Sequence, residues 1–189
     1  MQRLIAAAAA LVLVFAGCAS APPASRAAPE LELRLAPSLL GRPLNLQQHL
    51  TMQAPGREQQ LDVLLEADAA HVQLAMLAMG QVAGRLSWDG QSLVEARAPW
   101  WPKEVSSSRI LSDLQLTLWP AGAIQAALPA GWRLVEDGNV RTLTQDGEVV
   151  TVITRRNPLV VELDERRAHF KLKIESRELG NDAAASGNP

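Results

Sequence analysis

The sequence contains no tyrosine, only two phenylalanines and a single cysteine among its 189 residues. Without tyrosine the chain has no phenolic hydroxyls from which to build a polar site, and its interior must be largely aliphatic. A single cysteine excludes a framework of internal disulfides. The formal net charge of −2 at pH 7 gives no basic surface of the kind that nucleic-acid binding requires, so we expect no nucleic-acid partner.

Residue types that usually build catalytic or metal centres are scattered. The histidines lie far apart and in no metal-ligand spacing: His49, His71 and His169. The serines at 106–108 are not surrounded by the Gly-x-Ser-x-Gly turn of a nucleophile. Asp164 and Glu165 are adjacent carboxylates, but they lie where the solvated charges of strands and turns are normal. We therefore expect no enzymatic activity, no metal and no cofactor.

The longest apolar run lies at the N-terminus, from Leu4 to Phe15, directly after the positive charge of Arg3. This run is too short for a stable membrane span. A positive start, a short apolar stretch and a small residue at Gly17 are typical of a cleaved secretory signal. We assign residues 1–17 to a signal peptide.

The chain's only cysteine, Cys18, follows this run directly, and residues 15–18 (FAGC) resemble the lipobox of bacterial lipoproteins. The resemblance implies that the thiol becomes the acylated mature N-terminus, carrying two or three palmitate-like chains. At about 0.8 kcal/mol per buried methylene, such chains hold a protein on a bilayer. Ala19 stands where an inner-membrane retention signal has Asp, which implies the periplasmic face of the outer membrane. The alternative is an ordinary signal peptide followed by a bystander cysteine.

Three further segments follow the signal peptide. Residues 18–38 are rich in Ala and Pro, with apolar alternation only from Leu31, and are predicted to be a lipidated tether. Residues 39–178 are long enough for a single domain with its own core. Residues 179–189 are rich in Gly, Asn, Asp, Ala and Ser and are predicted to be a disordered tail.

The first half of the domain reads as strands. Apolar and polar residues alternate over 44–53, which predicts a half-buried strand in an antiparallel sheet. The alternation returns over 61–66, 72–88 and 92–97, between turn signals, and Gly80 and Gly84 indicate a bend in the middle segment. We predict a twisted meander of about five strands.

The period changes in mid-chain. The serines at 106–108 offer an N-cap for a helix that Pro120 ends, and Arg109 and Asp113 lie four residues apart on its second face. A shorter helix follows over 121–128. Strands then return, separated by clear turn signals, over the ranges 133–136, 140–144, 148–154, 159–164 and 170–175.

The predicted order of elements is similar to that of the LolA/LolB-type lipoprotein carrier fold. Here a lipobox is followed by strands, a pair of helices and further strands. This likeness implies an α+β fold in which a strongly curved antiparallel half-barrel carries the mid-chain helical pair as a lid. Residues 107–134 (SSRILSDLQLTLWPAGAIQAALPAGWRL) and 146–150 (DGEVV) more specifically resemble a family of small outer-membrane lipoproteins of unknown function, some encoded with aryl polyene biosynthesis. That resemblance covers most of residues 41–176 and supplies no catalytic residues.

The apolar residues of the sheet and helices can either pack into a filled core or enclose a cavity for an acyl or polyene chain. Ten are candidates for contact with such a ligand: Leu61, Val63, Leu74, Met76, Trp88, Ile110, Leu111, Leu114, Leu118 and Trp119.

Two functions follow from these readings. The first is a non-enzymatic, membrane-anchored lipoprotein of the outer membrane that binds or transfers a lipid-like molecule, such as lipoprotein acyl chains or an aryl polyene lipid. The second is a lipid-tethered structural or assembly partner of another protein, with a filled core and no ligand.

Overall fold

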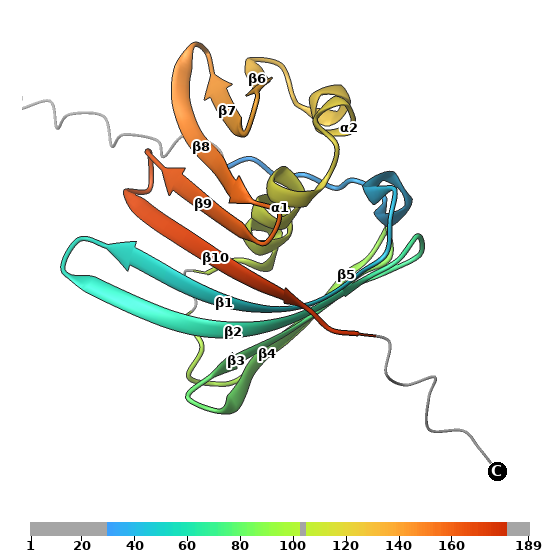
Figure 1. The fold of residues 1–189 in the computed structure, drawn as a ribbon, viewed down its shortest axis with the longest axis vertical. Coiled ribbons are helices and arrows are strands. Elements are labelled where there is room, and N and C mark those ends of the chain that lie inside the picture. Colours follow the sequence, from blue (N-terminus) through green and yellow to red (C-terminus); the bar gives the residue numbers. More distant parts are fainter. Residues whose placement is uncertain (1–29, 103–104, 181–189) are drawn as a thin grey trace, which may run out of the picture.

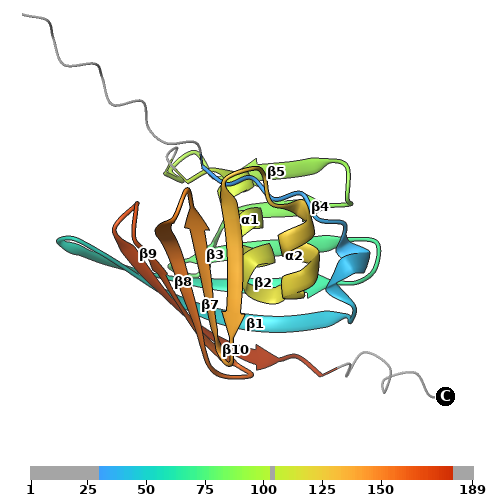
Figure 2. The ribbon, with the colours of Figure 1, turned by 90° about the horizontal axis from the view of Figure 1, so that it is seen from above.

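A computed structural model describes residues 30–102 and 105–180 of the chain. Ten strands form one antiparallel sheet, and two helices are inserted between the fifth and the sixth strand. The sheet is strongly curved, and both helices lie on its concave side (Figure 1, Figure 2). The chain is therefore mostly β, with the curved antiparallel sheet and the mid-chain helical pair that the sequence predicts. The predicted signal peptide, Cys18 and most of the predicted tail lie outside the described residues.

The elements follow the predicted ranges closely. A short 3-10 helix, η1 (Pro37–Leu40), precedes five strands: β1 (Leu44–Ala54), β2 (Arg57–Ala67), β3 (Val72–Ala78), β4 (Gln81–Trp88) and β5 (Leu93–Arg97). The two helices are α1 (Ser107–Leu118) and α2 (Ala121–Ala127). The last strands are β6 (Trp132–Asp137), β7 (Val140–Gln145), β8 (Glu148–Asn157), β9 (Val160–Glu165) and β10 (Phe170–Glu178). Neither helix, in the part of the chain described, is long and apolar enough to span a membrane.

The sheet consists of two meanders joined in the middle. Its strand order is β5-β4-β3-β2-β1-β10-β9-β8-β7-β6, so the last strand pairs with the first. In the described structure the edge strands β5 and β6 do not pair with each other, so the sheet stays open. Gly80 lies in the turn between β3 and β4, and the register of these strands shifts after Met76, so the predicted bend is a turn followed by an irregular pairing.

The register places one set of apolar side chains on the concave face. Leu46 of β1 lies opposite Leu65 of β2, which lies opposite Leu74 of β3. All three side chains are buried. Because side chains alternate between the two faces of a strand, this register sends every second residue of these strands toward the helices.

Helix α1 begins and ends as predicted, and its apolar residues are buried to different depths. The Ser106 hydroxyl accepts a hydrogen bond from the Arg109 backbone N–H (3.1 Å), which is the expected N-cap. The deepest side chains are Leu111, Gln115 and Trp119, which follow one another at intervals of four residues. The apolar residues that the sequence places at helical spacing therefore divide: Leu111 is fully buried, whereas Ile110, Leu114 and Leu118 are half-buried.

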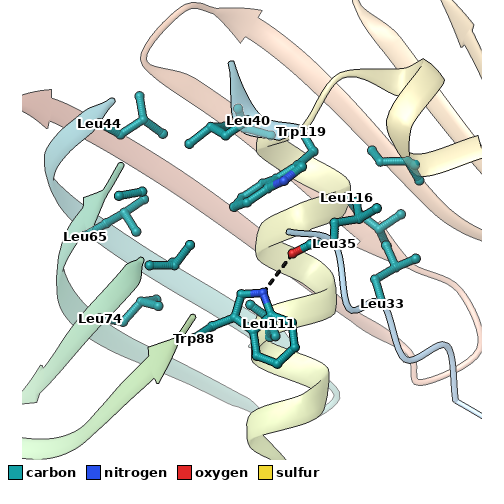
Figure 3. Packing of buried hydrophobic residues seen from close by; sticks show 14 of the residues in the cluster. Leu33, Leu35, Leu40, Leu44, Leu65, Leu74, Trp88, Leu111, Leu116 and Trp119 are labelled. Atoms are coloured by element: carbon teal, nitrogen blue, oxygen red, sulfur yellow. Dashed lines mark hydrogen bonds between the residues drawn. The ribbon is translucent and has the colours of Figure 1, made fainter. Parts of the chain in front are cut away.

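The tether expected over residues 18–38 is shorter than predicted. Leu31, Leu33 and Leu35 are buried in the core, and residues 31–36 form an extended segment, here called the strap, that lies against α1 (Figure 3). The prediction was wrong for residues 31–38 because the composition there resembles a linker, while Leu31, Leu33, Leu35 and Pro37 are buried. Residues 18–29 lie outside the described part.

Side chains of α1 satisfy the backbone of the strap. The Leu33 N–H donates to Ser112 Oγ (2.9 Å), and the Leu35 N–H donates to Gln115 Oε1 (3.1 Å). The Leu35 carbonyl accepts from Gln115 Nε2 (3.0 Å) and from Trp88 Nε1 (2.8 Å; Figure 3). These bonds replace a strand partner, which lets an extended segment lie buried beside a helix.

Two arginines from the sheet donate hydrogen bonds to the C-terminal end of α1. Arg141 Nη1 donates to the carbonyls of Leu116 and Trp119, each at 2.8 Å, and Arg155 Nη2 donates to the Thr117 carbonyl at 2.7 Å. Positive charge at a helix C-terminus is favourable because the last carbonyls lack helical partners. Helix α1 is therefore fixed by the strap along its length and by the sheet at its end.

Candidate functional site

The structure divides the ten predicted ligand-contact residues into two groups. Six are buried in the core: Val63, Leu74, Met76, Trp88, Leu111 and Trp119. Four are half-buried at its border: Leu61, Ile110, Leu114 and Leu118. The first group belongs to one packed core together with the strap leucines, so only the second group has surface left for a ligand.

Burial on the concave face decreases toward the tip of the β1–β2 hairpin. In β1, Leu46 is buried and Leu50 is half-buried; in β2, Val63 is buried and Leu61 is half-buried. The half-buried side chains of this region are here called the apolar margin, and they come from three neighbouring strands: Leu50, Met52, Leu61, Phe170, Leu172 and Ile174.

The register shows that the apolar margin is continuous. Leu50 lies opposite Leu61 on one side and opposite Ile174 on the other. Met52 lies opposite Leu172. Figure 1 shows β1 and β2 extending past α1, which explains why these concave side chains are less covered than those beneath the helix. The margin is thus an apolar part of the concave face that the chain's own helix leaves half exposed.

A half-open cleft of about 260 Å³ lies beside the margin. Its apolar lining comes from the strap, α1 and the strands β6 to β8, and includes Leu31, Leu116, Trp132 and Leu143. Its polar lining is formed by Glu30, Arg109, Ser112, Asp113, Thr151, Glu165 and Arg167.

Arg109 is the centre of the polar network in this cleft. Its Nε lies 3.0 Å from Asp113 Oδ1 and 2.9 Å from Oδ2, and its Nη2 lies 3.0 Å from Glu165 Oε2. Its Nη1 lies 3.7 Å from Glu30 Oε1. Thr151 Oγ1 donates to Glu165 Oε2 at 2.5 Å. Three carboxylates therefore surround one guanidinium.

The electrostatics of the network are dominated by burial. Burial raises the pKa of Asp113 from 3.8 to about 6; the Arg109 cation opposes this rise, and Glu165 and Glu30 reinforce it. Burial also disfavours the charge on Arg109. The attraction of the Asp113 and Glu165 carboxylates outweighs this effect of burial, and the pKa of Arg109 is raised. The single cation does not fully compensate the carboxylates around it.

Phe170 joins the cleft to the apolar margin. The Arg109 guanidinium carbon lies 5.6 Å from the centre of the Phe170 ring, within the range of a cation–π contact. At another part of the lining, Arg167 lies 5.9 Å from the Trp132 ring centre and donates to Gln145 Oε1 at 2.6 Å. No carboxylate of the described residues lies within 4.0 Å of the Arg167 side-chain nitrogens.

Sequence reasoning found part of this site. It placed Arg109 and Asp113 four residues apart on one helix face, and they form that ion pair. It treated Glu165 as a solvated charge, which was wrong, because the Glu165 side chain is only 3% exposed. The signal was present in β9, where Val161, Leu163 and Glu165 alternate onto the concave face.

The histidines stay apart, as their spacing indicates. His49 Nδ1 lies 2.9 Å from Asp62 Oδ1 at the surface, and His71 and His169 are exposed. Across residues 30–102 and 105–180, no group of three or more His, Cys, Asp or Glu side chains is arranged to hold a metal ion.

A family model for a protein of unknown function (DUF3261) matches residues 45–178. A comparison with curated proteins gave no match. The matched range begins in β1 and ends with the last residue of β10, so it contains both helices and nearly all of the sheet. The strap lies before it.

Proposed function

The chain belongs to the DUF3261 family, a protein family of unknown function, and from its own geometry we propose that it binds or transfers a hydrophobic lipid-like ligand. In this proposal it is a non-enzymatic periplasmic lipoprotein, anchored to the outer membrane through Cys18. The apolar chain of the ligand lies on the apolar margin. Lipoprotein acyl chains and an aryl polyene lipid are the two candidate ligands.

The half-exposed apolar margin is the observation that carries this proposal. Contiguous apolar side chains left open to water on a concave surface typically mark a site for another molecule. A ligand chain that removes about 300 Å² of apolar surface from water gains about 7.5 kcal/mol. That gain corresponds to a dissociation constant on the order of micromolar before the cost of ordering the chain.

The likeness to the LolA/LolB-type carrier fold belongs to the same proposal. An open curved sheet with a helix on its concave side is the arrangement that this likeness implies. The strap and the two arginines at the end of α1 argue against entry by displacement of that helix. We therefore place the entry of the ligand at the margin, where no backbone element has to move.

A second candidate function is supported by the packing of the core. Six of the ten predicted ligand-contact residues are buried by the chain's own side chains. In that case the protein is a lipid-tethered structural or assembly partner that acts through its surface. Apolar side chains available to a protein partner include Met79, Val94 and Trp100, which are 91%, 63% and 47% exposed.

A pair of substitutions on one strand distinguishes the two functions. Leu61 of β2 lies on the margin, whereas Leu64 of the same strand is 42% exposed on the opposite face. We expect Leu61→Gln to weaken the binding of a fluorescent fatty acid about five- to tenfold and Leu64→Gln to leave it unchanged, because only Leu61 contacts the ligand chain. Binding is measured by titrating the chain without residues 1–18. Equal effects of the two substitutions would mean that the ligand does not lie on the margin, and no binding at all would favour the structural function.

A further inference from the structure

The charges that line the cleft do not balance. Glu30, Asp113 and Glu165 supply three carboxylates, and all three lie within 3.7 Å of the same guanidinium, that of Arg109. The other cation of the lining, Arg167, makes no ion pair with any described residue and stacks on Trp132 instead. The cleft therefore presents an excess of carboxylate at one place and, at another, a guanidinium whose described partners, Gln145 and Trp132, are both neutral.

Because the carboxylates of the cleft are poorly hydrated, they favour the binding of a further cation. The Asp113 side chain is 18% exposed and that of Glu165 is 3% exposed, so water compensates little of their charge. A carboxylate whose pKa is raised by burial is stabilised when a second positive donor arrives. An ammonium group is such a donor, because it offers three N–H bonds and fits a small half-open space.

Arg167, whose charge is not paired with a carboxylate of the described residues, supplies the complementary charge. A guanidinium is suited to a phosphate because its N–H groups match two phosphate oxygens at once. A single ligand with an ammonium and a phosphate group would therefore engage both parts of the lining. Leu116 and Leu143 belong to the apolar part of the same lining.

The position of the cleft suits the head group of a lipid. Phe170 belongs to the apolar margin and contacts Arg109, so a chain lying on the margin would place its polar end at the cleft. Glu30 lines the cleft and is separated from Cys18 by only 11 residues. A stretch of that length spans at most about 40 Å, so an anchor at Cys18 keeps the cleft close to the bilayer.

We propose that the cleft binds the zwitterionic head group of a phosphoethanolamine-type lipid, with the ammonium at Asp113 and Glu165 and the phosphate at Arg167. This inference rests on the proposed function, because the acyl chain of the same lipid would lie on the apolar margin. It adds the chemical class of the head group, which the margin alone does not select.

Competition between two lysolipids tests the inference. Native mass spectrometry of the full chain in a non-ionic detergent, with equal amounts of lysophosphatidylethanolamine and lysophosphatidylglycerol bearing the same acyl chain, gives both complexes in one spectrum. We expect the ethanolamine complex to outnumber the glycerol complex about tenfold, since only ethanolamine carries the ammonium. Asp113→Asn should bring the ratio close to one while binding of both lipids persists.

Two further variants keep the test decisive. Glu30 is exposed at the rim and does not belong to the core, so Glu30→Gln should lower the ratio about twofold without loss of folding. Glu162 pairs with Arg156 on the surface, away from the cleft, and Glu162→Gln should leave the ratio unchanged.

The outcomes separate the head-group site from the proposed function. Equal amounts of the two complexes in the unaltered protein would overturn the head-group inference and leave lipid binding standing. If neither lysolipid forms a complex, the proposed function fails. Phosphoethanolamine without acyl chains then decides the inference alone, because binding that depends on Asp113 would support the site and lack of binding would overturn it.

Discussion

Gln115 is a polar residue that behaves as part of the core. It is fully buried on α1. Its side-chain carbonyl accepts a hydrogen bond from the Leu35 N–H, and its side-chain NH2 donates one to the Leu35 carbonyl, 80 residues earlier in the chain. A buried amide with both hydrogen-bonding ends satisfied costs little, whereas an unsatisfied one costs about 1–3 kcal/mol. This pairing explains why the most buried face of α1 includes a glutamine.

The titration of Asp113 predicts how the free energy of unfolding changes with pH. Its pKa of about 6 in the folded protein lies above the ordinary value of 3.8, so the native state binds this proton more tightly than the unfolded chain does. The stability that the group contributes is complete below pH 4 and is lost as the pH rises through 6. The free energy of unfolding, relative to that of Asp113→Asn, should fall by on the order of 1–3 kcal/mol between pH 4 and 6.5.

Asp68 is the control with the opposite sign. Its carboxylate accepts hydrogen bonds from the backbone N–H groups of His71 and Ala70, which lower its pKa. The stability of the protein relative to Asp68→Asn should therefore rise with pH. Urea unfolding at a series of pH values measures both differences. A flat or rising profile for Asp113 would contradict the account of the cleft.

The roles of individual residues could be predicted from the sequence where their partners lie a few residues away. The Ser106 cap and the Arg109–Asp113 pair follow from spacings of three and four residues. Gln115 and Glu165 were not assigned to the interior, because their partners come from segments far away in the sequence. For Glu165, the alternation of β9 was a sufficient signal, and the polar side chain obscured it.

At the scale of elements, the strap is the segment whose role changed most between sequence and structure. We predict that Leu33→Ala, at a side chain only 1% exposed, lowers the free energy of unfolding by about 2–4 kcal/mol through the cavity it leaves. Leu39→Ala, at a residue 47% exposed, should cost less than about 0.5 kcal/mol. Chemical denaturation measures both. Equal small losses would mean that the strap is the tether that composition suggested.

The strands and helices were predictable because their periods are clear. Alternation by two and turn signals located the strands, and the change of period located the helices. The strap has only three alternating leucines beside a Pro-rich stretch, and it pairs with helix side chains instead of a strand. The alternation is too short to outweigh the Pro-rich composition, and pairing with helix side chains leaves no local sequence signature.

At the scale of the whole molecule, the arrangement of the sheet depends on one long-range pairing. Hairpins join most neighbouring strands, but β10 must find β1 across more than a hundred residues. That pairing places Leu172 and Ile174 opposite β1 and brings in β10, which supplies half of the apolar margin. Local patterns predict the strands, but they do not predict which distant strands become neighbours, so the margin and the cleft could not be assembled from sequence alone.

The central claim is that the concave face carries a lipid-like ligand. Native mass spectrometry with lipid extraction tests this proposal, on residues 19–189 exported to a bacterial periplasm behind a cleavable signal peptide that replaces residues 1–18. We expect a stoichiometric amphiphile bound to the protein that is removed by organic extraction. The mass of that molecule would distinguish an acyl lipid from an aryl polyene lipid. A mass equal to that of the polypeptide alone, together with no uptake of a fluorescent fatty acid, would contradict the claim and favour a protein partner.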